Sequence, residues 1–246
     1  MVGDSAVTRK HNGVKTYSGG CKKVQFSQQA RIGFAIWGCA NVGATRMDQW
    51  LEQFIANDVH AGDGIVEVGE RLASKLNADL AKTDKSYSSR GIHISGYLNN
   101  VPVLYHLHSG HLDESPHELR LYRDYPDRIP MSIENFGVEI ASGSSAQLRN
   151  GRFEHFVALF NHVQSYSVTL KQFLNTEFPP PDLAGRLAYY QMLVRFIASV
   201  LRISKADGSV NEDLSWVAFD RYGSLIEHYV ESGIEPEDAN PVSLEC

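Results

Sequence analysis

The sequence predicts an α+β fold in which helices pack on antiparallel β-sheets. Strand-like segments come in groups, apolar residues recur at helical spacing in two pairs of successive segments, and a turn pair joins two strands in the middle of the chain. A parallel α/β fold would instead alternate strands and helices one by one. Two face-to-face sheets, each covered by a helix pair, would bury every apolar stripe. We therefore expect a four-layer αββα sandwich in one domain, residues 1–223, followed by an acidic tail, residues 224–246.

The first third of the chain predicts strands followed by two helices. Strand patterns cover 15–18, 23–26 and 32–37, with Gly and polar residues between them. A helix is predicted to begin near Thr45, because its apolar residues repeat at i, i+3, i+4, i+7 and i+8; they are Met47, Trp50, Leu51, Phe54 and Ile55. Asp63 has the position of a cap for a second helix. The stripe of that helix is Ile65, Val68, Leu72, Leu76 and Leu80.

The rest of the chain predicts a hairpin, a strand, two more helices and a strand. Asn99-Asn100 is a favoured turn pair between the strand patterns 91–98 and 101–108, and a further strand is expected at 136–140. A third helix carries Phe153, Phe156, Val157, Phe160 and Val163. Asp182 restarts the helical pattern after the Pro179–Pro181 run, with apolar residues Leu187, Tyr190, Val194, Ile197 and Leu201. The strand 216–219 follows.

Composition excludes several classes of protein. With 246 residues, 43% hydrophobic and 21% charged, the chain can bury a sizeable core. A formal charge of −6 argues against a nucleic-acid-binding surface, which needs clustered Lys and Arg. No stretch approaches the roughly 18 apolar residues of a membrane span, so we expect no membrane partner and a cytoplasmic location. Cys21, Cys39 and Cys246 form neither a CxxC pair nor a dense disulfide framework, and we expect no cofactor and no metal.

Several short motifs occur together in a particular order. They are Asp4 to Thr8, Cys21 to Val24, the strand 32–37 followed by Gly38, the hairpin 91–105, and Ser142-Gly143-Ser144. In this order they resemble the proteasome β-type subunits and their relatives among the N-terminal-nucleophile hydrolases. Each motif is short, so the resemblance rests on their order and spacing together. It covers residues 1–223 and implies the same αββα fold, a threonine-type peptidase or amidohydrolase activity, and a homo-oligomeric ring acting on a peptide or amide substrate.

The resemblance also implies roles for particular residues. In this family the nucleophile is the side chain of the mature N-terminal residue, and its α-amine is the general base. A lysine lowers the pKa of that amine and a carboxylate holds the lysine, roles that fall on Lys23 and Asp4. Gly38 matches the glycine whose backbone N–H binds the negatively charged oxygen of the intermediate. Ser142 and Asp207 match polar residues that hydrogen-bond the amine, although Ser209 follows Asp207 at two residues where the family has three.

The matching nucleophile is not found in the sequence. The family places it on a strand about a dozen or more residues before the position of Asp4, whereas only Met1, Val2 and Gly3 precede Asp4, and none of them has a hydroxyl or thiol. Two interpretations stay open. Met1 is an internal residue of a longer enzyme, or the chain is a non-catalytic homologue that serves assembly or regulation.

Other interpretations of the same residues also stay open. Each matched residue has an ordinary structural role as turn, exposed strand or loop residue. A metal site is suggested by His106, His108 and His111, with His93, Asp113 or His117 nearby. The commoner alternative is that histidines at the end of a hairpin face solvent. The third possibility is a purely structural ring subunit, for which aromatic residues exposed on helices would supply contacts. Trp50, Tyr189 and Phe196 are candidates, although each is equally suited to a core.

Overall fold

The computed structural model describes residues 1–4, 7–11, 14–18, 20–38, 41–83, 90–108, 120–122, 169, 171–173, 182–204, 213–220, 222 and 224–228. The chain divides into two compact units, which we describe separately. The first comprises Met1–Lys22 and Arg149–Ile234, and the second comprises Lys23–Leu148 and Glu235–Cys246. Among the described strands every pairing is antiparallel, which confirms the predicted α+β class with antiparallel sheets.

The second unit contains a five-stranded sheet in the order β10-β9-β8-β5-β4. Its strands are β4 (Val24–Ser27), β5 (Ile32–Gly38), β8 (Arg90–Leu98), β9 (Val101–His108) and β10 (Arg120–Tyr122). The predicted turn between β8 and β9 is confirmed, since Asn99 and Asn100 both have positive φ, 52° and 63°. A small hairpin of β6 (Asn41–Val42) and β7 (Thr45–Arg46) follows β5 and was not predicted.

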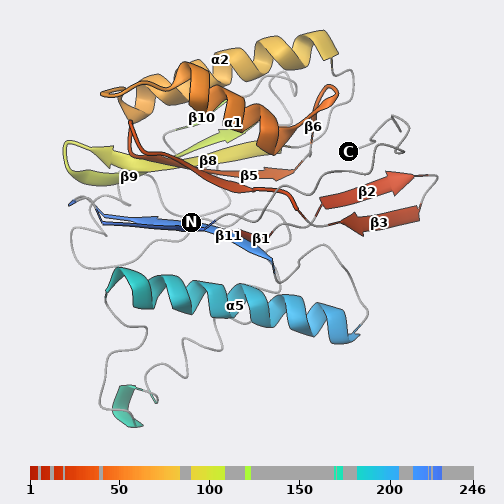
Figure 1. Ribbon diagram of the computed structural model, residues 1–246, viewed down its shortest axis with the longest axis vertical. Helices are drawn as coiled ribbons and strands as arrows, with labels where there is room; N and C mark the ends of the chain where they lie inside the picture. The colour runs from red at the N-terminus through yellow and green to blue at the C-terminus, as the bar shows by residue number, and fades with distance from the viewer. Residues whose placement is uncertain are drawn as a thin grey trace. The chain divides into compact units, whose positions relative to one another are not determined.

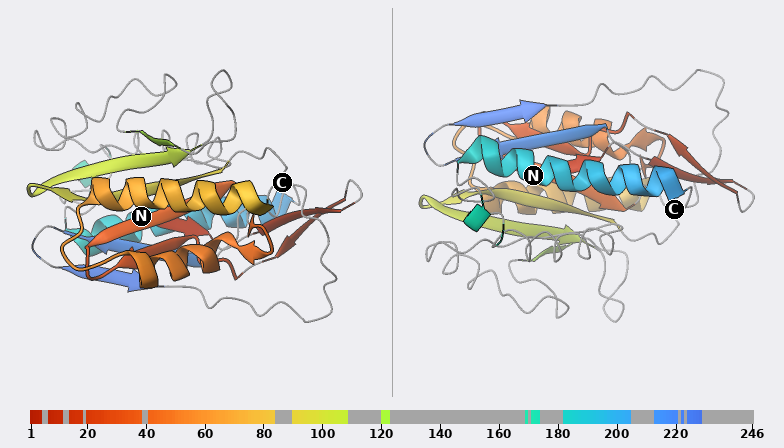
Figure 2. Two further views of the ribbon diagram at one scale, coloured as in Figure 1. Left: turned by 90° about the horizontal axis from the view of Figure 1, so that it is seen from above. Right: turned by 90° about the horizontal axis from the view of Figure 1, so that it is seen from below.

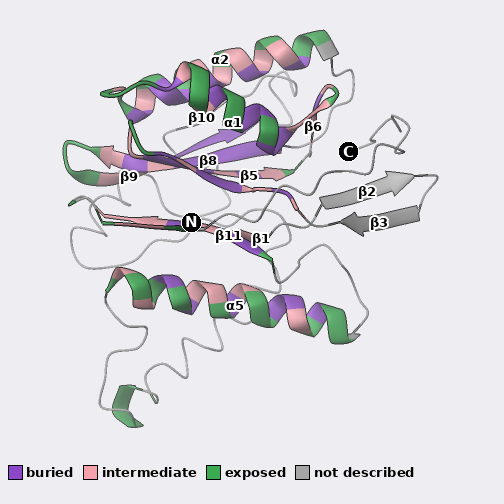
Figure 3. Cartoon of the chain, viewed as in Figure 1, coloured by how far each residue is buried: buried purple, intermediate pink, exposed green. Residues whose placement is uncertain are grey.

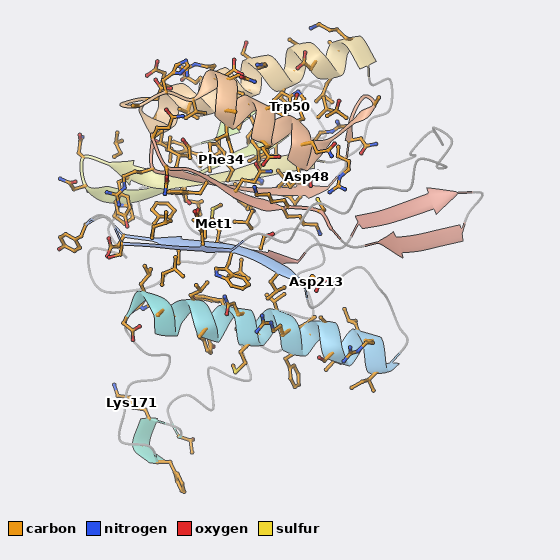
Figure 4. All side chains as sticks on the ribbon, in the orientation of Figure 1. Met1, Phe34, Asp48, Trp50, Lys171 and Asp213 are labelled. Atoms are coloured by element: carbon orange, nitrogen blue, oxygen red, sulfur yellow. The ribbon has the colours of Figure 1, made fainter. Side chains whose placement is uncertain are left out.

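Two helices cover one face of this sheet (Figure 1). They are α1 (Met47–Asp58), which contacts β4, and α2 (Ile65–Thr83), which contacts β8, β9 and β10. Their apolar stripes are those predicted, and seen from above both lie along the strands (Figure 2). Seven apolar strand residues on the helix-covered face are buried; they are Ile32, Phe34, Ile36, Ile92, Ile94, Tyr105 and Leu107. Phe34 points toward the helices in Figure 4.

Polar contacts fix the helices to each other. The indole of Trp50 donates to Asp79 Oδ2 at 3.0 Å, stacks on Phe54 and is only 7% exposed, so it belongs to the core. The guanidinium of Arg71 donates to Asp63 Oδ2 at 2.7 Å and also to the carbonyl of Asp58. Asp63 accepts from the backbone N–H of His60, so it closes the turn before α2 and is not a cap bonded to the first turn of that helix.

The first unit contains the sheet β1-β11-β12 and a long helix. Its elements are β1 (Val2–Asp4), β11 (Leu214–Phe219), β12 (Leu225–His228) and α5 (Leu183–Ser204), which contacts β1 and β11. The predicted cap is confirmed, because Asp182 Oδ1 accepts from the N–H of Gly185 at 2.8 Å. A separate hairpin joins β2 (Val7–His11) and β3 (Val14–Ser18). β12 lies inside the segment that the sequence assigned to the tail.

Some expected elements fall outside the described residues. These are the strand 136–140, the tail beyond 228 and most of the third helix, of which residues 169 and 171–173 are described and are helical. Burial on the described elements follows the expected pattern, with exposed positions on the outer surfaces of the helices (Figure 3). Where the structure describes helices, none has the length and apolar character needed to cross a membrane.

Candidate functional site

Lys23 and Gly38 lie at the same end of the β4–β5 pair. Val24 on β4 is the register partner of Ala35 on β5. The N–H of Ile36 donates to the carbonyl of Lys23 at 2.9 Å, which extends the strand pairing by one residue to Lys23. Gly38 is two residues further along β5, about 7 Å by the rise of a strand. Since backbone N–H groups repeat their direction every second residue, the N–H of Gly38 points to the β4 side, as that of Ile36 does.

Gly38 has a backbone conformation that glycine adopts readily. Its φ is +83°, in the region that other residues rarely adopt, and the residue is exposed. Gly38 ends β5 and does not open α1, which begins nine residues later after the β6–β7 hairpin. Its register partner on β8 is Arg90, which is 3% exposed and donates from Nη1 to the carbonyl of Asn41 at 3.2 Å. Arg90 therefore ties the chain after Gly38 to the sheet.

A buried ion pair fixes the start of α1 near this end of the sheet. The guanidinium of Arg46 donates to both carboxylate oxygens of Asp48, at 3.0 Å and 2.6 Å, and the Asp48 side chain is 1% exposed. Gln25 on β4 donates from its side-chain amide to the carbonyl of Asp48 at 2.7 Å. These contacts hold together the strand that follows Lys23 and the helix that follows Gly38. Figure 4 labels Asp48 at this end of α1.

The other matched residues are described in part or not at all. Asp4 is the last residue of β1 in the first unit, where its backbone pairs with Leu214. Ser142 and Asp207 lie outside the described residues. Of the five residues matched to the hydrolase family, the structure thus relates only Lys23 and Gly38 to each other.

A second cluster lies on the sheet face opposite α1 and α2. His93 is the register partner of His106, and their rings stack with centroids 4.6 Å apart. His106 and His108, predicted to share a strand face, also stack, at 4.5 Å. Trp37 on β5 donates from Nε1 to Nε2 of His106 at 2.9 Å. All three imidazoles are buried, with residue exposures of 8%, 3% and 4%, so the interpretation of His106 and His108 as solvent-facing is wrong.

Burial keeps the imidazoles of His93 and His106 neutral. Desolvation, with a smaller contribution from His108, lowers the pKa of His93 to about 4. Desolvation is also the largest cause that lowers the pKa of His106, to about 2, and electrostatic interactions with His93 and His108 lower it further. Because Nε2 of neutral His106 accepts the hydrogen bond from Trp37, its proton is on Nδ1. The indole therefore selects one tautomer and fixes the ring.

The stacked arrangement does not suit a metal ion. Ligating nitrogens must converge on one point about 2 Å away, whereas these rings lie one over another. Within the described ranges no group of three or more His, Cys, Asp or Glu residues could hold a metal. His111, Asp113 and His117, the other members of the predicted metal set, lie outside those ranges.

Sequence reasoning missed the pairing of His93 with His106 and the part played by Trp37. The signal for the pairing was present, since a two-residue turn at Asn99-Asn100 fixes the hairpin register and sets position 93 opposite position 106. No comparable signal marks Trp37, which reaches the cluster because β5 pairs with β8. The ring of Trp37 also lies over Gly91, where a Cβ would come within 2.6 Å of it.

The chain was compared with known protein families and with curated proteins. No family model matches it, and no curated protein sequence matches it.

Proposed function

We propose that the chain is the body of an N-terminal-nucleophile hydrolase that cleaves a peptide or amide bond. The observation that carries the proposal is the position of Lys23 and Gly38 at one end of the β4–β5 pair. A cation and a backbone N–H at the same end of a strand pair are the two groups that the reaction requires near its nucleophile. The positive φ of Gly38 adds support, because it explains why glycine occupies this position.

The fold that accompanies this proposal is the four-layer αββα sandwich. Each unit supplies an antiparallel sheet; α1 and α2 cover one face of the five-stranded sheet, and α5 contacts the three-stranded sheet. A sheet that buries residues on both faces needs a covering layer on each. The buried residues on the open face of the five-stranded sheet, Val24 among them, meet that condition.

The proposed reaction assigns each group one task. A hydroxyl or thiol on a mature N-terminal residue attacks the amide carbon, and its proton passes to the free α-amine of that residue and then to the departing amine. The N–H of Gly38 donates to the carbonyl oxygen while it carries negative charge. Lys23 keeps the α-amine unprotonated by its positive charge. Water then hydrolyses the acyl ester or thioester and restores the nucleophile.

The nucleophile is proposed to lie N-terminal to Met1. The test is the nucleotide sequence upstream of the Met1 codon, followed by expression of the extended chain. We expect in-frame codons for Thr, Ser or Cys and then an apolar strand, and release of fluorophore from peptide or amide substrates. A stop codon directly upstream would contradict the enzyme proposal and favour a non-catalytic subunit of a ring.

A further inference from the structure

The β2–β3 hairpin belongs to neither of the two larger sheets. Its strands, Val7–His11 and Val14–Ser18, form a two-stranded sheet, and in the described part of the chain each pairs only with the other. Figure 1 shows the two strands side by side. A sheet of two strands is marginally stable by itself, and backbone N–H and C=O groups along its outer edges can pair with a further strand. The hairpin therefore has edges to which a third strand could add.

Positive charge is concentrated in this part of the chain. Between Asp4 and Asp48 the sequence has no Asp or Glu, although the whole chain carries a formal charge of −6. The charged residues of this interval are Arg9, Lys10, Lys15, Lys22, Lys23, Arg31 and Arg46. The first three of them belong to β2 and β3. The hairpin is thus a cationic element of an anionic protein.

The strand register sets like charges against each other. Lys10 on β2 is the register partner of Lys15 on β3. A two-residue connection joins the strands, so the pair next to it is hydrogen-bonded. The following pair, Lys10–Lys15, is then of the closer, non-hydrogen-bonded kind, with Cα atoms about 4.5 Å apart. Like charges directly opposite each other destabilise a strand pair, so an acidic residue beside both lysines would stabilise the hairpin.

We propose that the β2–β3 hairpin binds an extended acidic peptide as a third, antiparallel strand. Such a peptide would supply both a strand for one edge and negative charge beside Lys10 and Lys15. In a non-hydrogen-bonded pair the backbone N–H and C=O groups of both residues point to the outer edges. The two lysines are therefore the residues that would bond the backbone of the added strand. Backbone pairing gives affinity in this mode of recognition, and the charges give specificity for acidic residues.

The open edges favour a peptide over a nucleic acid as the partner. A nucleic acid has no row of amide N–H and C=O groups to match a strand edge, and the net charge of the chain repels a long polyanion. A second copy of the hairpin is disfavoured, because it would bring the same positive charges together. The proposal goes beyond the hydrolase activity and does not depend on it.

The first test measures binding of a fluorescein-labelled peptide of alternating Glu and Val to the full chain by fluorescence anisotropy. The control is the same peptide with Gln in place of Glu. We expect the Glu peptide to bind about 10-fold more tightly or better, and to bind less tightly as salt is added. Equal binding of the two peptides, or binding by neither, would overturn the proposal. Equal or tighter binding of a single-stranded oligonucleotide of the same charge would overturn it too.

The second test locates the binding site. The double variant Lys10→Gln with Lys15→Gln is expected to weaken binding of the Glu peptide by about 10-fold or more. Lys82→Gln with Lys171→Gln makes the same change of charge at exposed positions outside the hairpin and should have little effect. Equal effects of the two double variants would show that the peptide does not bind at the hairpin.

Lys10→Glu checks that loss of binding is not loss of folding. It replaces a like-charge pair by an opposite-charge pair, so Tm is expected to stay the same or rise while binding is lost. A fall in Tm would contradict the opposition of Lys10 and Lys15 from which the proposal starts.

The last test distinguishes strand addition from a purely electrostatic contact. In an antiparallel addition the residue opposite Lys10 shares its face and exchanges hydrogen bonds with it, so that residue is a Glu. A peptide N-methylated on every Glu should therefore bind about 10-fold more weakly or worse, because the pairing N–H groups are gone. A peptide N-methylated on every Val should bind as the parent peptide does. Equal binding of the two methylated peptides, or weaker binding of the Val-methylated one, would overturn the proposal.

Discussion

The indole N–H of Trp37 donates a 2.9 Å hydrogen bond to Nε2 of His106 across three strands of the five-stranded sheet. The rings also lie close, with centroids 5.5 Å apart. This contact determines which nitrogen of His106 carries the proton, and it connects β5 to the stacked histidines of β8 and β9. The packing around it leads to the first prediction.

Gly91→Ala should destabilise the chain by about 2 kcal/mol, because overpacking a filled site typically costs this much. The new Cβ would meet the Trp37 ring and the carbonyl of Leu107, each at 2.6 Å. Gly64→Ala is the matched control, since a Cβ there has nothing within 4 Å. The measurement is the free energy of unfolding in urea, and equal values for the two variants would rule out the close contact of Trp37 with Gly91.

Stability should fall as the pH is lowered from 6.5 to 5. His93 and His106 have folded pKa values of about 4 and about 2, below the 6.5 of a free histidine, so in this interval the unfolded chain binds more protons. Each of the two histidines therefore lowers the free energy of unfolding by about 2 kcal/mol at pH 5. A hydrogen bond from Arg71 lowers the pKa of the Asp63 carboxyl, and one from Trp50 lowers the pKa of the Asp79 carboxyl. These two groups therefore affect the unfolding free energy only at lower pH.

The pH prediction is checked by unfolding the chain in urea at several pH values. His93→Leu should reduce the slope of the unfolding free energy between pH 6.5 and 5. A His93→Leu slope equal to that of the parent chain would show that the buried histidine does not cause the pH dependence.

Asp48→Asn should cost about 3 kcal/mol, because it leaves the Arg46 guanidinium without its carboxylate in a site where Asp48 is 1% exposed. Lys82→Ala breaks an ion pair with Asp79 whose side chains are 70% and 31% exposed, and should cost at most about 0.5 kcal/mol. Unfolding free energies of both variants check this. Similar losses would mean that the Arg46–Asp48 pair is solvated.

The sequence predicted regular elements better than the contacts between them. The stripes of α1 and α2 and the Asn99-Asn100 turn are local signals, and the structure confirms them. On α5 the predicted Leu187, Ile197 and Leu201 are buried, whereas Tyr190 and Val194 are only partly buried. β6, β7 and β12 are only two to four residues long, too short for a periodic pattern. The stacking of His93, His106 and His108 depends on register and burial, which no single segment encodes. Trp50 and Tyr189 proved to be core residues, and Phe196 is exposed.

A comparison of Gly38→Ala with Gly62→Ala distinguishes the effect of backbone strain on stability from an effect on activity. Both glycines have positive φ, +83° and +88°, so an added Cβ should destabilise the chain similarly, by about 1 kcal/mol each. Only Gly38 belongs to the proposed site. In an extended, active chain Gly38→Ala should lower kcat/KM by about 100-fold, since a small displacement of the N–H is enough, while Gly62→Ala should not. Equal activity of the two variants would remove Gly38 from the site.

The most direct test of the central claim compares Lys23→Ala with Lys22→Ala in the chain extended by its upstream residues. The two lysines are adjacent, and only Lys23 is assigned to the α-amine of the nucleophile. The measured quantity is kcat/KM on a fluorogenic peptide or amide. We predict a loss of about 100-fold or more for Lys23→Ala, the range of one acid–base contribution, and little change for Lys22→Ala. Equal activity of the two variants would contradict the proposed site.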